Sequence, residues 1–556
     1  MNGAAVAFAA LVILGLSYRF YGRYLSHKIF ELPKSDDENI PTPAFEFQDN
    51  IDFVPTKKNI LFGHHFSSIA GAAPIVGPAV AAIWGWVPAM IWIICGVVFM
   101  GACHDFGALV LSMRHKGESM ANVAESLLGP RAKVLFLTII FFLVWIVIAV
   151  FALVIAGLFI KFPASVIPVN FEIIIALIMG RYINKAGKSL TIPSLLAQAT
   201  LILMIILGTF YPISLSAVFG QYELIAWISF LMIYSFIASV LPVWLLLQPR
   251  DYINSHQLVV GLTLMILGLF VVQPEIVAPA FNLNPEGAPS WFPFLFITIA
   301  CGAISGFHGL VGGGTTSKQV RKWKDAKPIA YGSMLLEGLL AILATLAVTA
   351  GFKTSAAWHS HYASWDQANG LSQKIGAFVL GSGRFVAGLG IPEDISRTVI
   401  AVLIISFAAT SLDTACRIQR YIVAEFADYL KIPILKNRFV GSGFAVGSAF
   451  LLMLSSNGGK GGLSLWPLFG ATNQMLAALT LILITLYLIK NKKRYMNFLL
   501  PALFILTITT IGLSHNIYQL FMKKSYLLIL LSVLLLAAQF WVIVESFMAI
   551  RLYKKA

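Results

Sequence analysis

Polar side chains that could bind an ion share one face of the apolar segment 396–423. Thr410, Asp413, Arg417 and Arg420 are spaced so that an α-helix places them on the same side. This spacing predicts that Asp413 and Arg417 pair within the helix, which either only neutralises the two charges or leaves Asp413 to carry a proton. Hydroxyl oxygens suit a small hard cation, although they can also bond the preceding helical turn. The hydroxyl residues of this face are Thr410, Ser411 and Thr414.

Histidines and carboxylates also occur at membrane depth, where an ionisable group is costly and indicates a function. They are His64, His65, His104, Asp105, Glu172, His308 and Glu337. Imidazole titrates near neutral pH, so these histidines are candidates to carry a proton or to bind a substrate. No metal site is expected, because adjacent residues such as His64 and His65 diverge by about 100° on a helix. A haem-copper oxidase would need more histidine ligands than the spans provide.

Two glycine-rich segments, 62–78 and 302–318, interrupt the apolar runs that would hold these residues. The first contains Pro74 and Pro78, each of which removes a helical hydrogen bond. In lipid, a helix can break only where the freed backbone groups meet protein, water, an ion or a substrate. Broken helices in corresponding places of two halves indicate a transporter site. Glycines that only allow close helix packing are the alternative.

The composition is that of a polytopic membrane protein. Of the 556 residues 58% are apolar and 11% charged, and the mean hydropathy is +0.84, which excludes a soluble domain of this length. The excess of 39 Lys and Arg over 24 Asp and Glu lies in short clusters between apolar runs. These clusters follow the positive-inside pattern, so no nucleic-acid partner is expected. All four cysteines lie in apolar spans without metal-ligand spacing, and no disulfide is expected.

About fifteen apolar segments are long enough to cross a bilayer. Among the doubtful segments, 168–181 is short, and 375–390 is either re-entrant or the end of an external loop. Basic residues follow the first span rather than precede it, which predicts a retained span with an external N-terminus and a cytoplasmic C-terminus. On this topology the segments 60–83 and 293–313 run in opposite directions, as an inverted repeat requires.

Two more polar stretches interrupt apolar runs. Pro249 is expected to end a span and to leave Arg250 and Asp251 at the cytoplasmic face. Asn473 and Gln474 lie inside an apolar run and must find partners, either a ligand or a neighbouring helix.

Taken together, these segments closely resemble the carbon starvation protein A family. The resemblance is carried by residues 62–78, 104–106, 241–252, 302–319, 335–338, 411–421 and 465–474. It implies an uptake system of the bacterial inner membrane, active in carbon starvation, for peptides or, in some relatives, for pyruvate with a proton. It further implies an all-α fold with a LeuT-like inverted-repeat core, of the superfamily of amino acid, polyamine and organocation transporters, and peripheral helices.

The resemblance and the spans together predict three regions. Residues 1–59 form an N-terminal span and a cytoplasmic loop, 60–490 a transporter core with two inverted repeats, and 491–556 peripheral spans. The expected mechanism is alternating access around a midplane site, where free N–H groups of half-helices hold a substrate carboxylate. The residues predicted to bind the peptide or small carboxylate are Ser67, Ser68, Gly71, Gly306 and His308.

The coupling ion is expected to be a proton or a sodium ion, with no other cofactor. The resemblance to sodium sites of that superfamily favours Thr410, Ser411 and Thr414. Asp413, Glu337 or a histidine would instead carry a proton. An intramembrane histidine-based metal or redox enzyme and a passive channel are the alternative functions. The sequence leaves open the choice between peptide and pyruvate and the oligomeric state.

Overall fold

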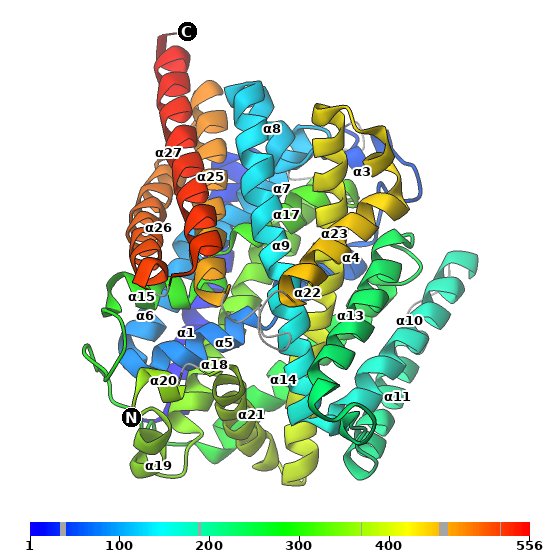
Figure 1. The fold of residues 1–556 in the computed structure, drawn as a ribbon, viewed down its shortest axis with the longest axis vertical. Helices are drawn as coiled ribbons and strands as arrows, with labels where there is room; N and C mark the ends of the chain where they lie inside the picture. Colours follow the sequence, from blue (N-terminus) through cyan, green and yellow to red (C-terminus); the bar gives the residue numbers. More distant parts are fainter. Residues whose placement is uncertain (34–39, 187–190, 369, 455–464, 523, 556) are drawn as a thin grey trace.

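A computed structural model describes residues 1–33, 40–186, 191–368, 370–454, 465–522 and 524–555. Within these ranges the chain is helical and has no named β-strand. Twelve of its helices are long and apolar enough to cross a membrane. Figure 1 shows them as a bundle with α26 and α27 at one edge and α10 and α11 at the other.

The long helices follow one another in the order of the predicted spans. The first span, Gly3–Ile29, begins with α1 (Gly3–Leu16), and the span Trp86–Arg114 joins α6 (Trp86–Gly96) to α7 (Ala102–Arg114). The others are α9 (Pro130–Lys161), α10 (Val166–Ala186), α11 (Thr191–Phe210), α13 (Glu223–Val240), α14 (Leu247–Val272), α18 (Ser333–Ala350), α22 (Glu393–Leu430), α25 (Trp466–Lys490), α26 (Met496–Met522) and α27 (Tyr526–Lys555).

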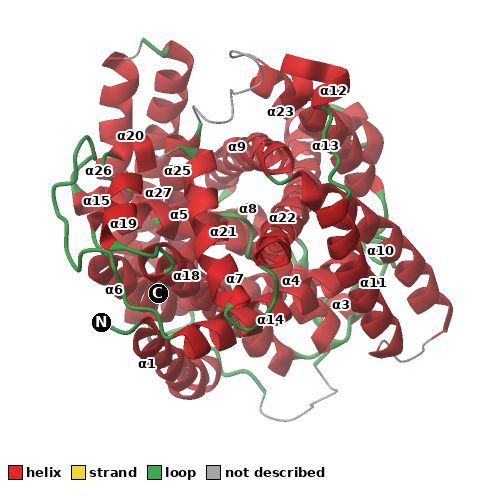
Figure 2. Ribbon diagram, turned by 90° about the horizontal axis from the view of Figure 1, so that it is seen from below, coloured by secondary structure: helices red, strands yellow, loops and turns green. Residues whose placement is uncertain are grey.

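The buried core is formed by α9, α18, α22 and α25, whose apolar residues are enclosed over most of their length. The helices α1, α11 and α27 keep much of their apolar surface exposed, as lipid-facing helices do. In the view of Figure 2, α18 and α22 lie inside the bundle, whereas α1, α10 and α11 lie at its rim. Polar residues on the central helices are therefore held away from lipid.

The first glycine-rich segment is a broken helix, as predicted. α4 (Lys58–Ile69) and α5 (Ala73–Ala81) meet at an angle of 44°. Pro74 lies in the first turn of α5, where its missing N–H leaves no intrahelical bond unmade. The break therefore precedes the proline and falls at residues 70–72.

The second segment is also broken. α15 (Trp291–Thr298) and α16 (Ala300–Ala303) end at Ile304, which with Ser305 is extended, and α17 (Gly306–Gly314) begins there. α5 packs against α16, and α4 packs against α17. The second half of the first segment thus contacts the first half of the second segment, and the two remaining halves contact each other. This pairing confirms that the two segments run in opposite directions.

The fifteen expected segments correspond to observed helices. Besides the twelve candidate spans there are the two broken segments and the 17-residue apolar helix α23 (Arg438–Leu454). The doubtful segment 168–181 lies within the candidate span Pro163–Tyr182. The segment 375–390 lies largely in α21 (Leu371–Ala387), which packs against α14, α18 and α22 and is not among the candidate spans.

Candidate substrate and ion site

Hydroxyl groups of α22 meet the first break. The Oγ atoms of Ser68 and Thr414 lie 3.2 Å apart, and Ser411 Oγ donates to the carbonyl of Ser68 over 3.0 Å. Gly71 faces the same place, because a Cβ there would lie 2.7 Å from Ser411 Oγ. Four oxygen atoms of three residues therefore converge where α4 ends.

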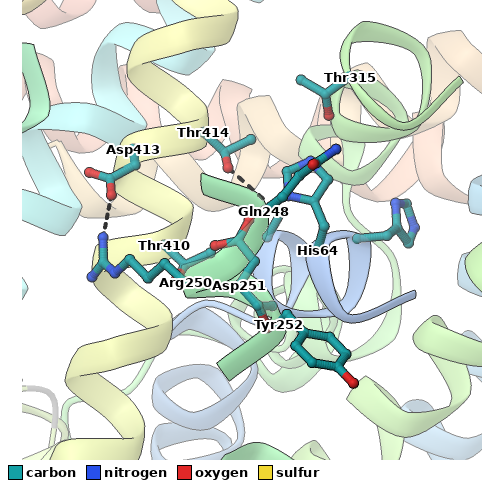
Figure 3. Close-up of polar contacts among 12 residues, drawn as sticks. His64, Gln248, Arg250, Asp251, Tyr252, Thr315, Thr410, Asp413 and Thr414 are labelled. Carbon is teal, nitrogen blue, oxygen red and sulfur yellow. Dashed lines mark hydrogen bonds and ion pairs between the residues drawn. The ribbon is translucent and has the colours of Figure 1, made fainter. Parts of the chain in front are cut away.

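The start of α14 joins this group from the other side. Ser67 Oγ donates to the carbonyl of Asp251 over 3.0 Å, and the Asp251 carboxylate is paired with His64 Nδ1. Asn254 Nδ2 donates to Thr410 Oγ1 over 2.7 Å. Figure 3 shows His64, Asp251 and Thr410 converging between α4, α14 and α22. The two serines predicted to bind substrate thus bond different helices, Ser67 to α14 and Ser68 to α22.

Arg250 is the centre of a buried charge network. Its guanidinium is paired with Asp413, contacts the Tyr234 hydroxyl at 2.6 Å and lies 3.4 Å from Glu172 Oε1. Tyr234 in turn donates to Asp413 over 2.8 Å, and Ser406 donates to Glu172 over 2.9 Å. Four helices, α10, α13, α14 and α22, are tied together by this network.

The predicted pairing of Asp413 with Arg417 is therefore wrong. Arg250 supplies the cation for Asp413. Arg417, one turn further along α22, instead donates to the carbonyls of Ala238 and Leu241 and lies 3.5 Å from Asp52. Asp413 and Arg417 are both buried, so each charge needs close partners in place of water. Neighbouring segments supply these partners better than a contact within the helix would.

The expected role of Pro249 is also wrong. It lies in the first turn of α14, so it starts a helix instead of ending one. Arg250 and Asp251 are only 1% and 0% exposed, and neither faces the cytoplasm. The signal missed in the sequence was a proline followed by polar residues that continue into the next apolar run, which is typical of a helix start.

A second polar cluster surrounds His308, the third residue of α17, directly after the second break. Its Nδ1 lies 2.9 Å from Asp105 Oδ2, and its Nε2 lies 3.3 Å from Glu337 Oε2. His104 Nδ1 lies 2.7 Å from the other oxygen of Asp105. α7, α17 and α18 each contribute to this cluster, and all four side chains are at most 1% exposed. His65 lies apart from these bonds and contacts Thr316 at 2.9 Å.

Gly306 and Asn473 fix the start of α17. A Cβ at Gly306 would lie 2.4 Å from the carbonyl oxygen of Asn473, so only glycine allows α17 to approach α25 this closely. Asn473 Oδ1 accepts from the N–H of Phe307 over 2.9 Å. Gln474 donates to the carbonyl of Phe296 over 2.9 Å. Both amides bond the second broken segment.

A cavity of about 210 Å³ lies between the end of α17 and α22. Its lining includes Ser119, Leu310, Lys318 and Tyr421. Asp52 accepts from the Tyr421 hydroxyl over 2.5 Å beside it. Burial alone would raise the pKa of Asp52, but Lys318, the Tyr421 hydroxyl and the nearby arginines lower it below its usual value. Asp52 therefore remains ionised and connects the loop before α4 to α22.

Among the described residues, no group of three or more His, Cys, Asp or Glu side chains is arranged to hold a metal ion. An all-helical membrane fold with two opposed broken helices around buried polar groups defines a transporter. The chain belongs to the family described as "Carbon starvation protein CstA", which matches residues 2–512. The predicted family is thereby confirmed.

Curated relatives match nearly the whole chain. "Peptide transporter CstA" of Bacillus subtilis (strain 168) is 34% identical over 98% of this chain and 96% of its own length. "Pyruvate/proton symporter BtsT" of Escherichia coli (strain K12) is 31% identical over 92% of this chain and 81% of its own length. This chain is accordingly a membrane transporter and neither an enzyme nor a passive channel.

The fold also has a solved counterpart. The crystal structure of MhsT in complex with L-phenylalanine superposes with a TM-score of 0.50, at 12% sequence identity, over 88% of this chain and 98% of that chain. At this identity the likeness concerns the fold alone. The expected LeuT-like architecture is confirmed.

Proposed function

We propose that this protein takes up peptides or small carboxylates such as pyruvate by alternating access, driven by an ion gradient across the bacterial inner membrane. The opposed helix breaks carry this proposal, because irregular backbone at membrane depth persists only where it lines a site. The names of the relatives support the substrate class, since peptides and pyruvate share a carboxylate. The N-terminus then lies outside and the C-terminus in the cytoplasm.

The start of α5 is suited to a carboxylate. Among the described residues, no hydrogen-bond acceptor is found for the N–H groups of Ala72 and Ala73. Free N–H groups at a helix N-terminus attract an anion. Ser67, Ser68 and Gly71 precede them on the same break, and Gly306 and His308 stand at the opposed break. Bound substrate would form hydrogen bonds with Ser67 and Ser68. These bonds would replace the ones that the two serines make to α14 and α22.

Two arrangements could hold the coupling ion. The Ser68 carbonyl and the hydroxyls of Ser411 and Thr414 offer oxygen ligands for sodium, with Thr410 nearby. Asp413 and Glu337 are buried acids that could carry a proton. Asp413 is paired with the fixed charge of Arg250 and Glu337 has no such partner among the described residues, which makes Asp413 the weaker proton carrier of the two.

The test is uptake of labelled pyruvate and labelled alanyl-alanine into proteoliposomes with proton and sodium gradients imposed separately. The wild-type protein should accumulate at least one probe above its external concentration. Ser68→Ala should lower this uptake, whereas Ser229→Ala should not, because Ser229 donates to the Ile225 carbonyl of its own helix and to no other helix in the described part of the chain. Failure of the wild type to accumulate either probe under either gradient would contradict the proposed function.

A further inference from the structure

The cluster around His308 differs from the Arg250 network in one respect, its lack of a fixed positive charge. Among the described residues, no lysine or arginine forms an ion pair with Asp105 or Glu337. Arg250, by contrast, stays protonated and compensates both Asp413 and Glu172. Only histidine protons can compensate the two carboxylates around His308, and histidine loses its charge near neutral pH.

Both ring nitrogens of His308 face carboxylate oxygens. Nδ1 lies 2.9 Å from Asp105, and Nε2 lies 3.3 Å from Glu337. A neutral imidazole carries one N–H, so it can donate to only one of the two acids. The other contact needs a second proton, either on the ring or on the Glu337 carboxyl. A proton on the ring or on the Glu337 carboxyl would therefore make the 3.3 Å contact between His308 and Glu337 attractive.

Asp105 is not the group that takes this proton. One of its oxygens faces His104 Nδ1 at 2.7 Å and the other faces His308 Nδ1, so each carboxylate oxygen has a ring nitrogen that can donate to it. Neither oxygen of Glu337 has a hydrogen bond of standard geometry within the described part of the chain. A buried carboxylate without donors is costly, so Glu337 gains most from protonation.

The contact between His308 and Glu337 also joins a broken helix to a continuous one. His308 is the third residue of α17, which begins at the second break, and Glu337 lies on the continuous helix α18. Loss of the proton would leave a nitrogen lone pair facing a carboxylate oxygen in a site closed to water. The two helices would then repel each other at this contact, and the break would change its position.

Few other titratable groups face the pair. His65 of α4 lies near His308 and Asp105, Cys301 of α16 lies near Glu337, and Cys103 of α7 lies near Asp105. Each of these is buried, and none supplies a fixed charge. They do not replace the proton between His308 and Glu337.

We propose that His308 and Glu337 hold the coupling proton of the transport cycle, with Asp105 and His104 as positioning residues. The assignment rests on the function proposed above. Proton binding joins α17 to α18, and proton release separates them. Because α17 begins at the break, its movement would alter the contacts of substrate bound there.

The test compares Glu337→Gln with Glu223→Gln in the full chain, reconstituted with the probe that the wild type accumulates. An amide at position 337 donates to His308 Nε2 as the protonated acid does, but it cannot release a proton. Glu337→Gln should lose accumulation driven by a pH gradient and should retain substrate exchange that no longer depends on pH. Glu223→Gln is the matched control, since Glu223 is also buried but accepts from Ser214 Oγ and the Leu215 N–H at 2.9 Å and belongs to neither charged cluster. It should keep both activities.

Accumulation by Glu337→Gln under a pH gradient at the wild-type level would overturn the assignment. So would sodium-driven accumulation by the wild type without proton movement, although the proposed function would survive. Infrared titration of the purified proteins tests the proton assignment without a transport measurement. The wild type should show a protonated carboxyl signal that Glu337→Gln lacks and Glu223→Gln keeps, and the same signal in all three proteins would overturn the proposal.

Discussion

At the scale of single residues, the partners of the buried charges decide what each can do. Arg250 and Asp413 lie far apart in the sequence and pair in the structure, whereas Asp413 and Arg417 share a helix face and do not. Helical spacing identifies which residues share a face, but it contains no information about the facing helix. The break sites were predictable because proline and glycine act on the local backbone. The contacts of Arg250 were not, because they depend on tertiary packing.

Removal of the central cation should destabilise the bundle. In Arg250→Met, Asp413 and Glu172 would be left buried without a counter-charge, which costs about 3–5 kcal/mol. The matched control is Arg397→Met, because Arg397 pairs with Glu393 at an exposed position, where loss of a pair costs about 0–1 kcal/mol. Thermal unfolding in detergent should show a large decrease in stability for the first variant only. Equal stability of the two variants would contradict the network.

A methyl group at the first break should impair transport. In Gly71→Ala the new Cβ would lie 2.7 Å from Ser411 Oγ and 3.2 Å from the Phe151 ring, so α22 or the break must move. Gly157→Ala is the control, since no atom lies within 4 Å of a Cβ at that position in α9. Uptake should fall several-fold for Gly71→Ala and stay unchanged for Gly157→Ala. Wild-type uptake in Gly71→Ala would remove the first break from the substrate site.

At the scale of elements, the loop before α4 borders the cavity between α17 and α22, where Phe53 is one of the lining residues. Asp52 connects it to Tyr421 and Arg417, while Lys318 stacks over the rings of Phe53 and Tyr421. This contact could not be predicted from the sequence, because the loop and α22 are more than 300 positions apart. In an alternating-access cycle such a contact must open on one side while the other side closes.

Asp52→Asn should open this end. Loss of a hydrogen bond to a charged group costs about 1.5–3 kcal/mol, which corresponds to roughly tenfold or more in the closing equilibrium. A cysteine placed in the cavity by Ser119→Cys should therefore react faster with a membrane-impermeant thiol reagent in the Asp52→Asn background. An unchanged labelling rate would exclude the loop as a gate.

The pH dependence of this contact follows from the lowered pKa of Asp52. A depressed folded-state pKa contributes stability that is present above the unfolded value and lost as pH falls through the folded value, here below 3.8. Asp52 thus remains ionised throughout the neutral range. The transport pH profile near neutrality should be the same in Asp52→Asn as in the wild type, and a shifted profile would contradict this.

At the scale of the whole molecule, the fold was largely predictable and the assembly of its sites was not. Apolar length and basic loops predicted the spans and the opposite directions of the broken segments, because lipid imposes the same constraints on every membrane chain. The packing of α5 on α16 and of α4 on α17 agrees with that prediction. The division into 1–59, 60–490 and 491–556 stays a prediction.

The central claim is that substrate binds between the two helix breaks, and a cryo-electron microscopy map with bound substrate tests it most directly. The map would be recorded for the full chain in a lipid nanodisc, with and without the probe that it accumulates. We predict that added density contacts the start of α5 beside Ser68 and approaches α17 near His308. Continuous helices at residues 58–84 and 291–314, or probe density confined to the cavity beside Lys318 and Tyr421, would contradict the account.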